Sequence, residues 1–316
     1  MIRCGRLRRM LGIVLLLALS GPALHAQATE IVMRPLPDGA KGPEPDLNGA
    51  VIDEALKRTV NRYGPYQYAE RIPVVARERL LDEMLRGEAI NITVVATQPV
   101  WEEQLHVIRI PIDMGLSGYR IALIRRDRQS LFNTVRDLDT LKRLRLGAGE
   151  AWSSRQIFAA EGFSVETGET YEALLRMLLA GRSDYFPRAL TEAFPEYDAR
   201  RKDFPDLAIE RDLLLNLPLP TYIFVSPKAP ELARRIEAGL ESMVRDGSLL
   251  RLVMKFNGDI LRRANLCSRR VFKLDNPLLT PQTPLRRKAL WFDPFDRRTG
   301  LCAAKTPPET NVQHGR

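Results

Sequence analysis

Arginines, aromatic rings and amide or carboxylate side chains stand next to predicted strands at several points of this 316-residue chain. An arginine presents a forked donor to a carboxylate or phosphate, and a helix N-terminus offers free N–H groups to an anion. The candidates are Arg34, Thr97, Gln98, Trp101, Tyr119, Arg120, Gly149, Glu150, Trp152, Arg188 and Glu192. As a set they predict a binding site for a small polar solute, anions included. For each arginine the alternative is an ion pair with a nearby acid, and for Trp152 it is a place in a core.

The segments between these candidates alternate between strand and helix patterns. Ile90–Ala96 is a continuous β-branched run, typical of a buried parallel strand. Arg77–Arg86 predicts a short helix, and Gly87 supplies its stop. A longer amphipathic helix is predicted from Pro230, ending at Asp246-Gly247. Strands that alternate with helices predict an α/β fold with parallel sheets.

Three stretches carry a resemblance to a known family. They are Leu81–Ile112 (LDEMLRGEAINITVVATQPVWEEQLHVIRIPI), Leu141–Phe158 (LKRLRLGAGEAWSSRQIF) and Tyr222–Gly258. Their order and spacing resemble family 3 of the periplasmic solute-binding proteins, the amino-acid-type substrate-binding proteins of ABC transporters, which have the type II periplasmic binding protein fold. The resemblance covers roughly Glu30–Gly258.

The resemblance implies two lobes, each with a central, mostly parallel sheet flanked by helices. The first lobe would comprise residues 29–111 and 220–275, and the second residues 112–219. A solute that touches both lobes favours the closed state by its differential affinity. The implied partners are a small-molecule solute and either an ABC permease or a membrane sensor. The expected protein is monomeric, with no cofactor and no metal.

Three positions depart from the family pattern. Trp101 stands where amino-acid binders place the arginine that clamps the α-carboxylate. The family's acid for the α-ammonium aligns near Ala189, and Glu192 is the nearest acid to replace it. The usual Gly-Thr of the second-lobe loop is Gly149-Glu150. These departures argue against an ordinary α-amino acid and leave the class of solute open.

The N-terminus predicts export. Four arginines within the first ten residues precede the apolar run Leu11–Leu19, and small residues follow, ending in Ala26-Gln27-Ala28. This is the pattern of a signal peptide over residues 1–28. The apolar run is shorter than the roughly 20 residues of a membrane-spanning helix. No cysteine follows it to carry a lipid anchor, so we expect a soluble periplasmic protein.

Net charge and the cysteine positions further limit the classes of protein to which the chain could belong. The formal net charge is +9, and it falls to +5 when the four arginines of the signal peptide are removed. The basic residues are scattered, which gives no nucleic-acid signature. Cys267 and Cys302 remain in the mature chain. The sequence allows either a disulfide between them or two free thiols. The proline-rich segment 276–316 predicts a partly disordered C-terminal tail.

An enzyme is the main alternative. His106 is the histidine left between the signal peptide and the tail, so a histidine-based triad or metal site is not expected. Glu150 and Glu192 across a cleft could work as an acid/base pair, as in the small-molecule dehydratases that share this fold. A second alternative is a ligand-sensing partner of a membrane receptor. The residues favour a binding protein with no catalytic residues.

Overall fold

The computed structural model describes residues 29–36, 46–69, 72–73 and 77–302. The expected signal peptide, 1–28, and the last part of the expected tail, 303–316, lie outside the described residues. In the described part of the chain, no helix combines the length and the apolar content needed to cross a bilayer.

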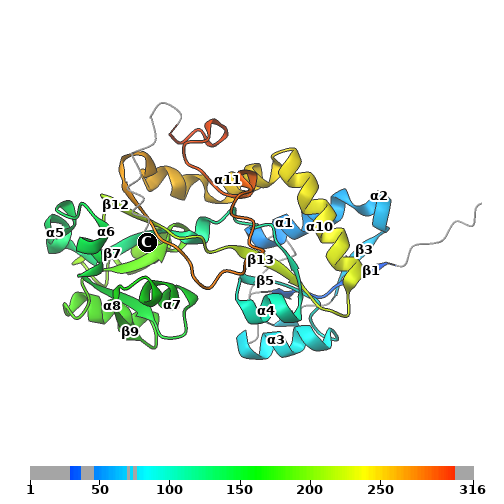
Figure 1. The fold of residues 1–316 in the computed structure, drawn as a ribbon, viewed down its shortest axis with the longest axis horizontal. Coiled ribbons are helices and arrows are strands. Elements are labelled where there is room, and N and C mark those ends of the chain that lie inside the picture. The colour runs from blue at the N-terminus through cyan, green and yellow to red at the C-terminus, as the bar shows by residue number, and fades with distance from the viewer. Residues whose placement is uncertain (1–28, 37–45, 70–71, 74–76, 303–316) are drawn as a thin grey trace, which may run out of the picture.

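The molecule has two lobes that lie side by side in Figure 1. Strands of the first lobe are β1 (Glu30–Val32), β2 (Pro35–Leu36), β3 (Tyr66–Tyr68), β4 (Ile72–Pro73), β5 (Ile92–Ala96), β6 (His106–Ile108) and β13 (Thr221–Val225). Its helices are α1 (Leu47–Arg58), α2 (Val60–Tyr63), α3 (Arg77–Arg86), α4 (Pro99–Gln104), α10 (Pro230–Arg245) and α11 (Ser248–Arg263).

The second lobe is built from the middle of the chain. Its strands are β7 (Tyr119–Arg125), β8 (Arg145–Gly149), β9 (Ser164–Gly168), β10 (Phe186–Ala189), β11 (Leu207–Ile209), β12 (Leu213–Asn216) and β14 (Arg270–Lys273). Its helices are α5 (Gln129–Asn133), α6 (Leu138–Lys142), α7 (Ser153–Ala160), α8 (Tyr171–Leu179) and α9 (Leu190–Arg200).

Local sequence explains the long helices. Helix α10 begins with Pro230 at its first position and buries the apolar face predicted from the sequence, Leu232, Ile236, Leu240 and Met243. Gly239 lets α10 approach α1, because a Cβ at this position would lie 2.4 Å from the carbonyl oxygen of Ala55. Gly247, with a φ of +73°, then separates α10 from α11.

The sheets are mixed. Among the described strands, four pairings are parallel and five are antiparallel. The parallel pairings include β8 with β9, as the strand–helix–strand pattern predicts. The antiparallel ones all involve β7 or β13, the strands that enter a lobe from the crossings between lobes. The two-lobed α/β architecture is therefore as expected, but the expectation of mostly parallel sheets does not hold for these two strands.

The two crossings between the lobes run next to each other. The amide of Leu217 donates to the carbonyl of Gly118 at 3.1 Å. A Cβ at residue 118 would lie 1.8 Å from the Leu217 oxygen, so only glycine permits this approach. Across the same junction, the Ser117 hydroxyl lies 3.3 Å from that of Thr221. The hinge region is thus a hydrogen-bonded pair of segments.

One predicted lobe boundary needs correction. The first lobe was expected to extend to residue 275, but β14 pairs in parallel with β12 in the second-lobe sheet. The chain therefore returns to the second lobe after α11. Sequence pattern did not reveal this, because Arg270–Lys273 is a short strand that pairs with residues more than fifty positions earlier in the chain.

The C-terminal segment is packed as far as residue 302. We call residues 274–302 the strap; it is the orange-to-red segment that follows β14 in Figure 1. At the second lobe, the Asn276 side chain donates to the carbonyl of Pro218 at 2.8 Å. At the first lobe, the Thr280 hydroxyl donates to Glu102 at 2.8 Å. The strap, which includes the described part of the predicted tail, thus bonds to both lobes.

The end of the strap is fixed by several kinds of contact. Leu290 and Phe292 are buried in the largest core cluster, and the Phe292 amide donates to the carbonyl of Met114 at 2.7 Å. Arg287 forms a two-pronged ion pair with Glu241 of α10 at 2.5 Å. Cys302 closes the segment through a disulfide with Cys267.

Candidate functional site

The lobes approach each other where two candidate segments meet. Gln98 follows β5 and precedes α4, and Ser153 is the first residue of α7. The Gln98 amide nitrogen lies 3.3 Å from the Ser153 hydroxyl oxygen and donates to it. Figure 1 shows α4 and α7 on facing sides of the gap between the lobes. The structure therefore brings the Thr97-Gln98 segment of the first lobe to the Gly149–Trp152 segment of the second.

A buried carboxylate organises the first-lobe side. Thr97 donates its hydroxyl to Oε1 of Glu102 at 2.5 Å. The other oxygen, Oε2, accepts two hydrogen bonds from the Arg109 guanidinium, at 3.1 and 2.9 Å, and one from Thr280 of the strap. The Glu102 side chain is 2% exposed, so these donors replace the water that an ionised carboxylate requires. The network holds the end of β5, the start of α4 and the strap in one arrangement.

On the second-lobe side, Trp152 is held by its neighbours. Its ring packs over Gly149, where a Cβ would lie 2.4 Å from a ring atom, so glycine is needed there. The guanidinium of Arg188 lies 4.4 Å from the centre of the Trp152 ring. Arg188 also binds Glu196 through two hydrogen bonds at 2.8 and 2.5 Å. Gly149, Trp152 and Arg188 are thus brought together as expected, but the arginine is already neutralised.

The two candidate acids have separate surroundings. Glu192 accepts a hydrogen bond from the Ala189 amide at 3.2 Å, which caps the first turn of α9, and it pairs with Arg188 at 3.1 Å. Glu150 is exposed, and its backbone amide donates to the carbonyl of Gly168. Glu192 therefore has a local structural role, which does not fit the hypothesis of an acid/base pair.

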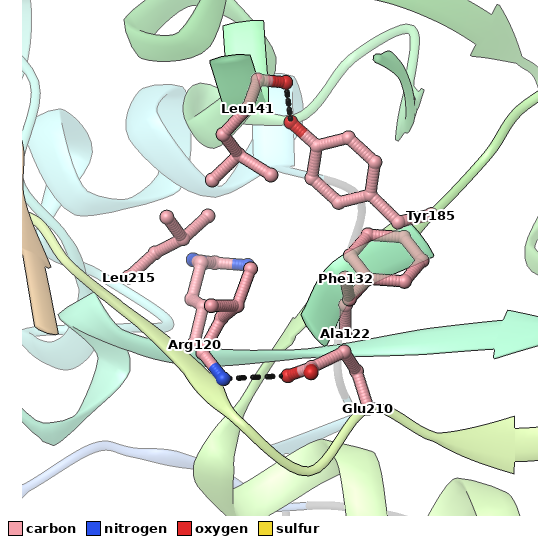
Figure 2. A pocket seen from close by; sticks show the side chains of 8 residues that line it. Arg120, Ala122, Phe132, Leu141, Tyr185, Glu210 and Leu215 are labelled. Atoms are coloured by element: carbon pink, nitrogen blue, oxygen red, sulfur yellow. Dashed lines mark hydrogen bonds between the residues drawn. The ribbon is translucent and has the colours of Figure 1, made fainter. Parts of the chain in front are cut away.

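Arg120 does not line an open cleft. Its side chain extends into the second-lobe core, among Ala122, Phe132, Leu141, Tyr185 and Leu215, as Figure 2 shows. The residue is 7% exposed, and its buried Nε has no hydrogen-bond partner in the described part of the chain. Burial lowers the pKa of Arg120 to about 10. The hollow beside it, about 10 Å³, has room for about one water molecule.

Three other candidates are corrected by the structure. Trp101 is a core residue, 2% exposed, with its ring edge-on to Phe224 at 5.5 Å, because α4 turns its apolar face toward the sheet. Tyr119 is buried and donates its hydroxyl to the carbonyl of Phe292 in the strap at 2.9 Å. Arg34 pairs with Asp46, the N-cap of α1, at 3.0 Å. We assign none of the three to a solute site.

Sequence reasoning missed Glu102, Ser153 and Thr280. The Glu102–Arg109 pair left a weak signal, since an acid and a base seven residues apart flank a short apolar strand. Ser153 directly follows the candidate Trp152 but has no feature of its own that marks it as a site residue. Thr280 left no signal, because it lies 178 residues away from the carboxylate that it contacts.

Comparisons with known proteins show the fold. The sequence matches no family model, and no curated protein matches it. Among solved structures, a double mutant of the VFT2 domain of Bordetella pertussis BvgS is 17% identical with a TM-score of 0.51, over 72% of this chain and 93% of that one. The chain has the two-lobed type II periplasmic binding protein fold.

Other solved structures are similar at lower scores. An ancestral arginine-binding protein bound to arginine is 17% identical with a TM-score of 0.46, covering 73% of this chain and 99% of that one. A periplasmic His/Glu/Gln/Arg/opine family-binding protein from Silicibacter pomeroyi, in complex with lysine, is 16% identical with a TM-score of 0.46, covering 72% of this chain and 98% of that one.

Proposed function

We propose that this protein is an exported, non-enzymatic binding protein that captures a small polar solute between its lobes by hinge closure and presents it to a membrane partner, an ABC permease or a sensor. The observation that carries the proposal is the contact between Gln98 and Ser153, since it joins a strand end of one lobe to a helix start of the other. Ligand sites in proteins favour such junctions between lobes, and closure of two lobes around a ligand is an established type of hinge motion.

The chemistry of the contact defines the kind of solute. Gln98 offers an amide with donors and an acceptor, Ser153 offers a hydroxyl, and the start of α7 offers backbone N–H groups. Two of the arginines expected to clamp an anion are already occupied: Arg120 is buried, and Arg188 is paired with Glu196. We therefore propose a neutral or weakly anionic polar solute, bound by amide and hydroxyl groups.

A thermal-shift screen tests the proposal. The purified mature protein is measured with amino acids, polyamines, organic acids and cell-wall fragments, and a bound solute raises the melting temperature by mass action. For any solute found, Gln98→Ala and Ser153→Ala should each weaken binding about tenfold, which corresponds to one lost hydrogen bond to a buried partner.

The control is Gln67→Ala, which removes an exposed glutamine from β3. It should leave both the solute affinity and the melting temperature unchanged. If the Gln98 and Ser153 variants bind the solute as tightly as the unmodified protein, the site does not lie at this contact. Turnover of a solute in the same screen would contradict the proposal and favour an enzyme.

A further inference from the structure

A polar hollow lies in the second lobe, at the end away from Gln98 and Ser153. It has a volume of about 90 Å³, and Arg125, Arg128, Arg145, Gly181, Ser183 and Asp184 line it. Arg145 begins β8, whose last residue is Gly149 beside Trp152, and Arg125 ends β7, whose first residue is at the hinge. The hollow is therefore separated from Gln98 and Ser153 by the length of the sheet.

The charge of the lining is positive. Three guanidinium groups share the lining with one carboxylate, Asp184: Arg125 and Arg128 come from the end of β7 and the turn after it, and Arg145 comes from the start of β8. Arg145 already neutralises that carboxylate, since its Nε and Nη2 lie 3.2 and 3.1 Å from the two oxygens. Arg128 lies 3.7 Å from the same carboxylate, beyond hydrogen-bond distance. Arg125 binds Asp127 through Nε and Nη2, which leaves its third nitrogen, Nη1, available.

The hollow is shaped by its own backbone. Arg145 also donates to the carbonyl of Gly181 at 2.8 Å, so its guanidinium is held from two directions. Gly181 has a φ of +71°, and a Cβ there would lie 3.2 Å from Nη1 of Arg125. A side chain at residue 181 would press on that nitrogen, so the glycine keeps space open beside it.

A buried hydroxyl in the lining has no partner. Ser183 is 2% exposed, and no described atom accepts or donates a hydrogen bond at its Oγ. Buried polar groups are rarely left unbonded, because losing water without replacement costs free energy. An occupant with acceptor oxygens would satisfy the remaining guanidinium donors. Rotation of the Ser183 side chain would turn its hydroxyl, which faces Gly147 in this structure, toward the same occupant.

We propose that this hollow binds a small tetrahedral oxyanion of the phosphate or sulfate class. The volume has room for several water molecules, which suits a group of a few heavy atoms. Arginine forks match the oxygen geometry of phosphate, and the Ser183 hydroxyl adds a neutral donor. The occupant is either the free ion or the terminal group of a phosphate ester, since both present the same oxygens.

Calorimetric titration of the mature protein with inorganic phosphate tests the proposal, alongside melting temperatures in phosphate, sulfate and chloride at equal ionic strength. We expect saturable binding of phosphate and no comparable effect of chloride. Arg128→Gln should weaken binding about tenfold through loss of a charged donor, and Ser183→Ala several-fold. A parallel titration with ethyl phosphate distinguishes the sources: tighter binding than inorganic phosphate indicates an ester, and weaker binding indicates the free ion.

The matched control is Arg143→Gln, which removes an exposed arginine of the same lobe whose guanidinium bonds to Thr140 outside the hollow. It should bind phosphate as the unmodified protein does, and so should Gln98→Ala, because the two sites are separate. Absence of saturable binding overturns the proposal. Equal weakening by Arg143→Gln and Arg128→Gln also overturns it, since that result means an adventitious ion only.

Discussion

Outside the hinge, two regions link the lobes, and they do so with different chemistry. At the proposed solute site, an uncharged amide and a hydroxyl meet at 3.3 Å, which is long for a hydrogen bond. At the strap, a disulfide, a two-pronged ion pair and buried aromatic and aliphatic side chains act together. Because the first contact is weak, a solute can replace it at little cost. The strap combines a covalent bond with ionic and apolar contacts, so it is held more firmly than the contact between Gln98 and Ser153.

The largest expected effect comes from opening the disulfide. Cys267 and Cys302 are 35 residues apart, and closing a loop of this length stabilises a protein by about 4 kcal/mol through the entropy of the unfolded chain. Urea unfolding with and without reductant should show a loss of this order.

The double variant Cys267→Ser/Cys302→Ser serves as the control, since it should match the reduced protein and respond no further to reductant. Affinity for the solute should change less than stability, because the site itself is untouched. A reduced protein as stable as the oxidised one would contradict the importance we give to the strap.

An intermediate loss of stability is expected for a change at Arg188, which lies in the second lobe next to Trp152. Arg188→Ala leaves Glu192 and Glu196 without their shared cation and removes the guanidinium from the Trp152 ring. Breaking such a largely buried pair should cost about 2–3 kcal/mol in the free energy of unfolding.

Arg200→Ala provides the matched control, because Arg200 is on α9 and pairs with Glu172 at a more exposed position; there we expect less than about 1 kcal/mol. If Arg188→Ala instead weakens solute binding at unchanged stability, Arg188 belongs to the solute site, as the sequence first indicated.

The smallest expected effect depends on pH and concerns the ion pair between the strap and α10. Hydrogen bonding from Arg287 lowers the pKa of Glu241. A carboxyl group whose pKa is lowered by folding stabilises the protein above its unfolded pKa, and this contribution is lost as the pH falls through the folded pKa. Glu241→Gln should therefore cost less than about 1 kcal/mol at neutral pH, and the difference should shrink toward pH 3.

Glu237→Gln, at an exposed position of the same helix, should show no such pH dependence. Unfolding curves at both pH values measure the effect. A constant difference between Glu241→Gln and the unmodified protein would mean that the ion pair does not anchor the strap.

The elements were predictable where the pattern is local. The apolar face of α10 recurs at helical spacing, and the β-branched run of β5 marks a buried strand, so both lie close to their expected bounds. Helix α4 and strand β14 were missed, because each is short and takes its structure from a neighbouring element. Of the candidate residues, Gln98 contacts the other lobe, and its partner Ser153 lies directly after the candidate Trp152. The solute site itself stays a prediction.

By itself, the sequence determined the strands and helices that have a clear local pattern, the resemblance to a two-lobed binding fold and the presence of two cysteines that could pair. Only the tertiary structure decided which charges are satisfied and what the C-terminal segment does. Hydrophobic periodicity is a property of neighbouring residues and can be read along the chain. The depth of Arg120 and the bond from Thr280 to Glu102 depend on which distant segments folding brings together.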